Sequence, residues 1–285
     1  MTDSGRGHVE NLGGSSCYTG GIDVHAARGW QIRHNRFQGI YCTNGGLAEH
    51  AIHMWNGCRD TVIENNTITD CARGIGLGMG SGTGVPLRSW PDAPHGGGAF
   101  GHVDGIVRNN VIWAAINQYD TGIEIAQARR PVVVHNTVVN ADGLSGFFSS
   151  IDYRFAGTVA IIQNNLTRRI TARDGATGTV DHNVENAGPS VFTDAAGGDF
   201  HLAAGATAAI NQGIPLDEGG VDLDGVAHSN GAPDVGADER YRRTRRVTSQ
   251  KRASASFMAR RLGASSALPR RGLRRLRGGP VGYWL

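Results

Sequence analysis

The sequence is poor in proline, aromatic residues and lysine, and it contains no long apolar run. Only 9 of the 285 residues are proline, 7% are aromatic, and Lys251 is the single lysine. No apolar run approaches the roughly 18–20 residues of a membrane helix, so we expect no membrane span. The 43 glycines follow no Gly-X-Y period, which excludes a collagen-like chain. The first residues show no cationic stretch followed by an apolar region, so no signal peptide is visible.

Negative charge is missing from the C-terminal end of the chain. All 25 acidic residues lie at or before Glu239, whereas the 28 basic residues divide evenly at Arg240, so residues 1–239 carry −11 and residues 240–285 carry +14. Such an Arg-rich tail is a disordered basic segment, a nucleic-acid-binding segment or a non-native extension, and the abrupt change of composition after Glu239 favours the last. The net charge of +3 is therefore no evidence that the folded body binds nucleic acid.

All four cysteines lie in the first quarter of the chain, at Cys17, Cys42, Cys58 and Cys71. They permit two disulfides in three pairings, or four small buried thiols, and the spacing leaves both alternatives open.

A short segment that ends in asparagine recurs six times. Each copy has aliphatic residues, a variable position, His or Asn, and then the recurring asparagine. The copies are QIRHNRF (31–37), VIENNTI (62–68), IVRNNVI (106–112), VVHNTVV (133–139), IIQNNLT (161–167) and TVDHNVE (179–185). The recurring residues are Asn35, Asn66, Asn110, Asn136, Asn165 and Asn183.

A second segment type precedes the first five copies. Its copies are GGIDVHA (20–26), HAIHMWNG (50–57), RGIGLGMG (73–80), TGIEIAQ (121–127) and SSIDYRF (149–155). Both segment types alternate with period two between Gly, Asn and Asp, which is typical of short strands.

Short strands with asparagine at a fixed corner predict stacked coils of a parallel β-solenoid, with strands about 4.8 Å apart. Asparagine tolerates the left-handed backbone of such a corner, and its amide can bond the amide of the next coil. The preceding residue shares the corner, so we expect His34, His135 and His182 to be structural rather than catalytic.

The Gly-Ile-x-hydrophobic and Ile-x-Asn-Asn-x-Ile strands resemble right-handed parallel β-helix proteins of the pectate-lyase-like superfamily, over roughly residues 10–200. The resemblance implies an all-β fold of about six irregular coils and a bacterial, extracellular or cell-surface protein. The superfamily holds polysaccharide lyases, glycoside hydrolases, epimerases and non-catalytic surface proteins, so the resemblance is weak for function. Residues 199–239 resemble the closing segment of such bacterial proteins.

Stacking the second segment type in register predicts which side chains face the core and which face outward. Ile22, Ile52, Ile75, Ile123 and Ile151 form one core column, and Val24, Met54, Leu77, Ile125 and Tyr153 form another. Side chains alternate along a strand, so the positions between these columns face outward. The first outward column is Asp23, His53, Gly76, Glu124 and Asp152, and the second is His25, Trp55, Gly78, Ala126 and Arg154.

The outward columns predict a carbohydrate site. Glu124 and Asp152 fall on neighbouring coils, where their carboxyls approach about 5 Å, the separation of a retaining glycosidase. We expect these two residues to perform acid–base catalysis, supported by Asp23, His53 and Arg154. A lyase base would have to be Arg154, His25 or His53, because the body lacks lysine.

The remaining outward positions predict where a glycan lies. Trp55 suits stacking on a sugar, His25 lies beside it, and Gly76 and Gly78 leave a flat floor. The insertion at residues 81–103 follows this floor, and we expect it to overhang the same face. An acidic cleft favours a neutral glycan, or Ca²⁺ for an acidic one.

A calcium site is a further prediction for the closing segment. Asp222, Asp224 and Asp234 supply hard oxygen ligands, although their spacing departs from the EF-hand loop, so turn chemistry is the favoured alternative.

We therefore divide the chain into an N-terminal segment or partial cap (1–19), a β-helix (20–198), a closing segment (199–239) and the Arg-rich tail (240–285). Either residues 1–19 form a minimal cap or an upstream portion is missing. The leading function is a monomeric hydrolase or lyase that processes a polysaccharide. The alternative is a non-catalytic surface or adhesion β-helix that binds glycan or is purely structural.

Overall fold

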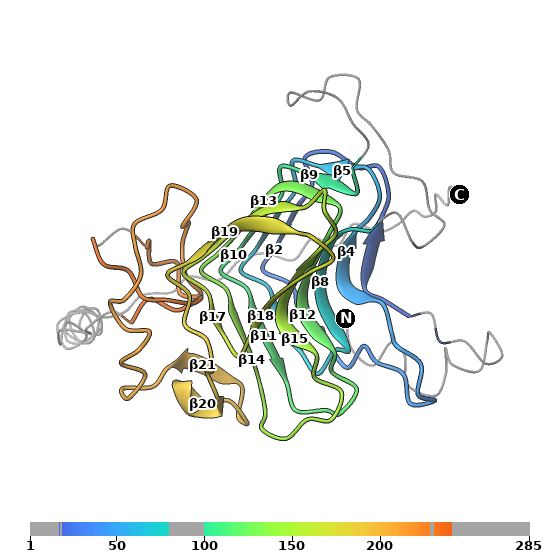
Figure 1. Ribbon diagram of the computed structural model, residues 1–285. Helices are drawn as coiled ribbons and strands as arrows, with labels where there is room; N and C mark the ends of the chain where they lie inside the picture. Colours follow the sequence, from blue (N-terminus) through green and yellow to red (C-terminus); the bar gives the residue numbers. More distant parts are fainter. Residues whose placement is uncertain (1–16, 18, 80–99, 229–230, 241–285) are drawn as a thin grey trace, which may run out of the picture. The chain divides into compact units, whose positions relative to one another are not determined.

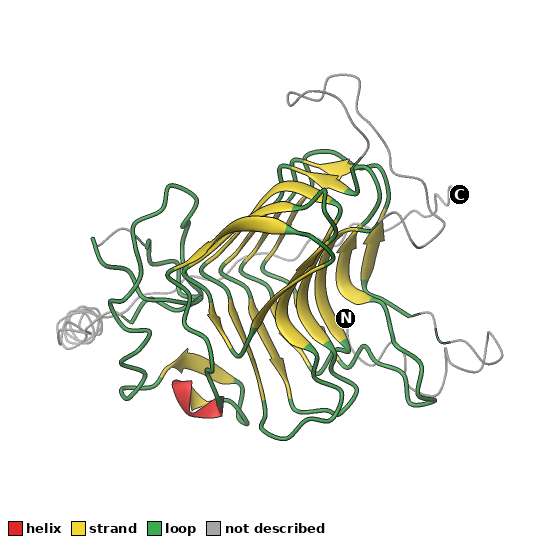
Figure 2. Ribbon diagram, in the orientation of Figure 1, coloured by secondary structure: helices red, strands yellow, loops and turns green. Residues whose placement is uncertain are grey.

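The computed structural model describes residues 17, 19–79, 100–228 and 231–240. The chain divides into two compact units, residues 1–240 and 241–285, and the described residues all belong to the first. They form three parallel sheets and one antiparallel pair, and no α-helix occurs among them (Figure 2). Consequently, no helix in this part of the chain is long or apolar enough to cross a membrane.

The first sheet has six strands in sequence order, all parallel (Figure 1). They are β1 (Ile22–Val24), β4 (His50–Met54), β8 (Arg73–Gly78), β12 (Thr121–Ala126), β15 (Ser149–Arg154) and β18 (Ile170–Arg173). Each pairs only with the strand before and after it in this order, so the sheet is a stack of equivalent segments.

The second and third sheets are also parallel. The second contains β2 (Gln31–Arg33), β6 (Val62–Glu64), β10 (Ile106–Arg108), β13 (Ala128–Val134), β16 (Val159–Gln163) and β19 (Thr177–Asp181), with β5 (Cys58–Arg59) and β9 (His102–Val103) beside this row. The third contains β3 (Arg36–Gln38), β7 (Thr67–Thr69), β11 (Val111–Ala114), β14 (Thr137–Asn140) and β17 (Leu166–Thr167). The chain visits the first, second and third sheets in that order again and again, and we call one such passage a circuit.

The core lies between the three sheets and is built from like residues stacked on like. The register pairs Ile22 with Ile52, Ile52 with Ile75, and so on through Ile123 and Ile151, which confirms the predicted core column. The last four of these isoleucines are fully buried. β-branched side chains suit this packing because they fill a pleated surface with few rotamers.

The asparagine column forms a continuous ladder, as predicted. Each side-chain amide donates to the side-chain oxygen of the asparagine one circuit further on, at 2.9–3.0 Å, from Asn35 through to Asn183. The left-handed backbone, however, belongs to the residue before the ladder and not to the ladder itself. Those residues have φ between 52° and 56°, and they are His34, Asn65, Asn109, His135, Asn164 and His182.

The C-terminal part of the first unit runs along the ladder corner. Asn164 donates to Ile214 O, Asn109 to Gly219 O, and Asn65 to Asp222 O, so the segment passes successive circuits in reverse order. A short 3₁₀ helix (Pro189–Val191) and the antiparallel pair β20 (Phe192–Asp194) and β21 (Asp199–Leu202) precede it. Phe192 and Phe200 pack with Trp113 in a second apolar cluster that includes third-sheet residues.

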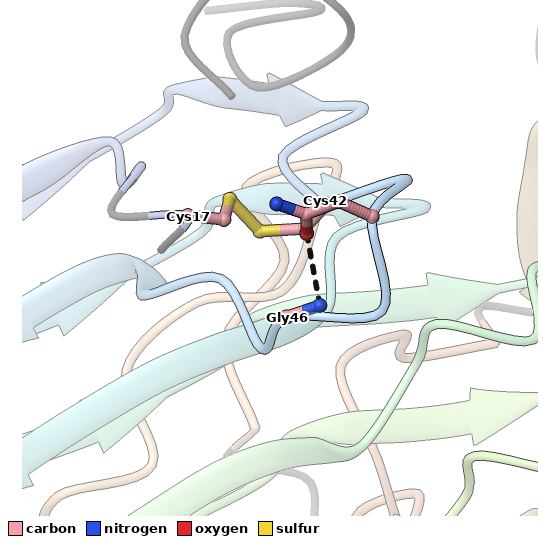
Figure 3. The surroundings of a disulfide bond; sticks show 4 residues. Cys17, Cys42 and Gly46 are labelled. Atoms are coloured by element: carbon pink, nitrogen blue, oxygen red, sulfur yellow. Dashed lines mark hydrogen bonds between the residues drawn. A yellow bond between two sulfur atoms is a disulfide. The ribbon is translucent and has the colours of Figure 1, made fainter. Parts of the chain in front are cut away.

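One disulfide, Cys17–Cys42, ties the start of the described chain to the loop before β4 (Figure 3). Cys58 and Cys71 are buried thiols that take part in no disulfide. The structure thus combines the two alternatives left open by the cysteine spacing, one disulfide and two buried thiols.

Candidate functional site

The outer face of the first sheet carries the predicted column of ionisable residues. The register pairs Asp23 with His53, His53 with Gly76, Gly76 with Glu124, and Glu124 with Asp152, as the stacking predicted. Asp23 is exposed, but the other three side chains are more enclosed than on a solvated face, since His53 and Asp152 are 1% exposed and Glu124 is 8% exposed.

An irregularity one residue before the core isoleucines adds further side chains to this face. A Cβ built on Gly74 would lie 2.3 Å from Gly122 O, and one on Gly122 would lie 2.7 Å from Ser150 O. The carbonyl of the next strand therefore occupies the space of a side chain, which explains the small residue before each isoleucine. Simple alternation would turn His50 and Arg73 toward the core, yet both approach Glu124.

Glu124 lies among cations from three other strands. Its carboxylate is 3.4 Å from His50 Nε2, 3.8 Å from an Arg73 nitrogen and 3.9 Å from an Arg154 nitrogen. Burial raises the pKa of a carboxyl, but these neighbours outweigh it and lower the pKa of Glu124 to about 2. Glu124 is therefore ionised over the whole physiological range, which is unsuited to a proton donor and leaves the roles of nucleophile or proton acceptor.

Asp152 is held by Arg173, a residue that the sequence did not single out. Arg173 donates to both carboxylate oxygens, with nitrogen–oxygen distances of 2.6–3.1 Å. Burial raises the pKa of Asp152 against the opposing effect of Arg173. Because both oxygens are engaged, the acid–base role predicted for Asp152 requires Arg173 to move.

Arg154 contacts both the buried Glu124 and the exposed Asp174. Besides Glu124, it contacts Asp174 through Nε at 3.0 Å and lies over the Phe155 ring at 4.3 Å. Arg173 and Arg169 lie over the Phe148 ring at 4.7 and 5.8 Å. Phe148 is 36% exposed, so arginines and an accessible aromatic ring meet beside Asp152.

Glu49, His50 and His53 form a compact group at the other end of the cluster. A single carboxylate oxygen of Glu49 lies 2.9 Å from His53 Nδ1 and 3.3 Å from His50 Nδ1. Despite its burial, the two imidazoles hold the pKa of Glu49 far below its usual range. Burial lowers the pKa of both histidines, but Glu124 and Glu49 reverse the effect for His50, whose pKa is raised, while the pKa of His53 is lowered.

The prediction that Gly76 and Gly78 leave a flat, open floor is wrong for Gly76. A Cβ on Gly76 would lie 2.8 Å from His53 Cδ2 and 3.0 Å from the His50 ring, so the two imidazoles already cover this position. Gly78 has φ +77°, its Cβ position lies 2.1 Å from Ala126 O, and its own carbonyl lies 2.9 Å from His53 Nε2. Both glycines thus serve the packing of the cluster.

Trp55 is packed more tightly than an open sugar platform would be. It is 9% exposed, its ring stacks on His25 at 5.0 Å, and it contacts His53 at 4.6 Å. His25 is 3.9 Å from Asp23, and both are partly exposed. The ring of Trp55 therefore supports His53 from the side of β1.

The aspartates predicted to bind calcium order backbone turns. Asp222 accepts from the amides of Asp224, Val226 and Glu239 at 2.7–3.0 Å. Asp234 accepts from the amides of Asn211 and Arg240, both at 2.6 Å. This geometry favours turn chemistry for Asp222 and Asp234, while Asp224 is exposed and lies 3.5 Å from His201.

Four residues of the site were not predicted from the sequence: Glu49, His50, Arg73 and Arg173. A signal was present, because the residues two positions before the core isoleucines include His50, Arg73, Thr121 and Ser149. A core-facing column would be apolar, so this polar column indicated a break in the alternation.

Comparisons with known proteins add no family to this description. No protein-family model matches the chain, and no curated protein matches it significantly. The predicted overhang by residues 81–103 falls largely on residues 80–99, outside the described part, and the end of the insertion enters β9.

Proposed function

We propose that this chain is a right-handed parallel β-helix protein of the pectate-lyase-like type that processes an extracellular polysaccharide on the outer face of the first sheet. The observation that carries the proposal is Glu124, a carboxylate with a pKa of about 2 placed among His50, Arg73 and Arg154. Ionisable groups from several circuits converge there, and perturbed pKa values gather at functional sites. The Cys17–Cys42 disulfide supports an oxidising, extracellular setting.

The arginines favour a glycan that carries carboxylates. Arg154 and Arg173 are partly exposed, Arg169 is exposed, and each lies against an aromatic ring. A guanidinium fork matches a carboxylate in geometry and charge, and an exposed ring such as Phe148 suits the apolar face of a sugar. This replaces the neutral glycan expected from the acidic composition, because Arg73, Arg169 and Arg173 were not counted in that expectation.

Glu124 takes the role of base or nucleophile in this proposal. Its ionised carboxylate can accept a proton beside a uronate carboxyl if Arg154 leaves it to neutralise that carboxyl, as a lyase requires, because the cations that lower its pKa also make it a weak base. It equally suits attack on an anomeric carbon in a retaining hydrolase.

The test is a panel of polyuronates and neutral polysaccharides incubated with the full chain. We expect new chain ends from a polyuronate, and a loss of at least about 100-fold in Glu124→Gln, the scale of a general base. Asp142→Asn is the matched control, because Asp142 is 78% exposed and pairs with Arg168 away from the cluster. Unsaturated ends identify a lyase, whereas saturated reducing ends identify a hydrolase.

A non-catalytic glycan-binding β-helix is the second candidate, favoured by one observation. Asp152 is 1% exposed and is bonded through both oxygens to Arg173, which is how a structural ion pair looks. Retention of the chain on an immobilised polyuronate without any new chain ends establishes this alternative. Turnover that persists in Glu124→Gln and in Asp152→Asn removes the proposed site.

A further inference from the structure

The group of Glu49, His50 and His53 has an unusual arrangement of hydrogen-bonding atoms. Nδ1 of His53 faces Glu49 at 2.9 Å, and its Nε2 faces the Gly78 carbonyl at 2.9 Å. Both partners are acceptors, whereas a neutral imidazole has only one N–H. One of the two contacts therefore sets lone pair against lone pair unless a cation stands between the partners or the ring carries a second proton.

His50 repeats the same arrangement. Its Nδ1 lies 3.3 Å from the same Glu49 oxygen, and its Nε2 lies 3.4 Å from Glu124 Oε2, without a hydrogen bond. The ring is 1% exposed, so bulk solvent does not reach it. Two buried imidazoles thus point the same ring nitrogen, Nδ1, at one carboxylate oxygen.

The spacing of these three atoms fits a metal ion. Glu49, His50 and His53 each offer one ligand atom, and the three atoms lie within 4.8 Å of one another. Ligands at about 2.0–2.1 Å from a tetrahedral zinc ion are separated by about 3.3 Å. The two measured separations to Glu49, 2.9 and 3.3 Å, lie close to that value, so small shifts of the side chains suffice.

The outer partners of the two histidines are those of a metal site. A ligating histidine usually donates its second N–H to a carboxylate or a backbone carbonyl, which fixes the ring. In this structure Nε2 of His50 faces the Glu124 carboxylate, and Nε2 of His53 faces the Gly78 carbonyl. Gly76 completes the arrangement, because a side chain there would displace both rings.

We propose that Glu49, His50 and His53 bind one divalent transition-metal ion of the zinc class, with Glu124 as the partner that orients His50. Two imidazole nitrogens select such ions over calcium and magnesium, which prefer oxygen ligands. Three protein ligands leave a coordination position for water, as in catalytic zinc sites. The site shares Glu124 with the proposed glycan activity, but its three ligands are other residues and its test contains no glycan, so the two proposals can fail separately.

The experiment uses the full chain, stripped with a chelator and then titrated with Zn²⁺ by calorimetry and with Co²⁺ by visible absorption. We expect one ion per chain, and for Co²⁺ the intense bands of tetrahedral coordination. Glu49→Gln and His53→Gln abolish this binding, and Glu124→Gln weakens it by about 10- to 100-fold, the usual effect of losing an outer partner.

The matched control is His201→Gln, which changes an exposed histidine that lies 2.6 Å from Asp199 and near Asp224. This variant retains the ion if the proposal is correct, and loses it if the metal binds at the surface. Circular dichroism of each variant checks the fold. Because Glu49→Gln and Glu124→Gln keep side-chain shape, the series remains decisive even if His53→Gln unfolds.

Two results overturn the proposal. One is the absence of stoichiometric binding of Zn²⁺ and Co²⁺ by the stripped native chain at micromolar concentrations. The other is binding that is unchanged in Glu49→Gln. Either result assigns the cluster to the proton alternative, in which the His53 ring is protonated and donates to both Glu49 and Gly78.

Discussion

Arg173 bonds both carboxylate oxygens of Asp152 across neighbouring strands of the first sheet, β15 and β18. Asp152 is 1% exposed, while the Arg173 side chain is 31% exposed. Arg173 is therefore the main compensation of the buried carboxylate, with a smaller contribution from Arg154, whereas the guanidinium itself is open to solvent.

Removing Arg173 leaves a buried charge without its partner. We expect Arg173→Gln to lower the free energy of unfolding by about 3 kcal/mol, measured by urea denaturation at pH 7. Arg168→Gln is the matched control, since Arg168 pairs with the exposed Asp142 and should cost about 1 kcal/mol or less. Equal effects in the two variants contradict the buried-pair interpretation.

The lowered pKa of Glu124 predicts a pH dependence of stability. The folded pKa of about 2 lies below the ordinary value of 4.5, so its contribution is fully present above pH 4.5 and is lost as pH falls toward 2. We expect Glu124→Gln to be less stable than the native chain by about 2 to 3 kcal/mol at pH 7, with the difference shrinking between pH 4.5 and 2. The exposed Glu185 supplies a control, and Glu185→Gln should show no comparable convergence in denaturation curves.

Gly76→Ala tests whether the His50 and His53 rings cover Gly76. The added methyl would lie 2.8 Å from His53 Cδ2, so the rings must move, and we expect a loss of about 1–3 kcal/mol. Gly205→Ala, where nothing lies within 4 Å of the new Cβ, should change stability by less than about 0.5 kcal/mol. Thermal denaturation of the two variants is sufficient, and an unshifted melting temperature for Gly76→Ala contradicts the described packing.

We expect an asparagine in the middle of the ladder to contribute more to the free energy of unfolding than the asparagine at its end. Asn136 is fully buried and donates to Val107 O, Val134 O and Asn165 Oδ1. Asn136→Ala removes the side-chain donor to the two carbonyls and the oxygen that accepts from the Asn110 backbone and side-chain amides, and we expect a cost of about 3 kcal/mol. At the exposed end of the ladder, Asn35→Ala should lower the free energy of unfolding by about 1 kcal/mol, as measured by urea denaturation. Two small and similar losses would contradict a stabilising role of the ladder.

Much of the fold was readable from the sequence because stacking aligns like residues. The Gly-Ile-x-hydrophobic and Asn segments gave the strands, their parallel register and the amide ladder, all of which depend on local period and spacing. The left-handed corner was placed one residue too late, since His34 and its equivalents adopt it. Asparagine tolerates the left-handed backbone well. The ladder position nevertheless requires asparagine for another reason, because its side-chain amide makes the hydrogen bonds between circuits.

The candidate site was only half readable. Glu124 and Asp152 were found because strict alternation places them outward, and His50 and Arg73 were missed because the same rule sends them inward. A backbone irregularity at Gly74 and Gly122 overrides the rule, and it depends on the carbonyls of the next strand. Arg173 was missed because it lies in β18, after the last recognised copy of the second segment type (149–155).

The sequence by itself determined the repeat, the core columns and the residues of the outward columns, since these follow from side-chain alternation and spacing along single strands. Only the tertiary structure decided that Gly76 is covered by His50 and His53, that Asp152 is bound to Arg173, and that Glu124 is the carboxylate surrounded by cations. Those relationships join residues from different circuits, and the distances and burial that set charge and pKa arise only when the circuits are stacked.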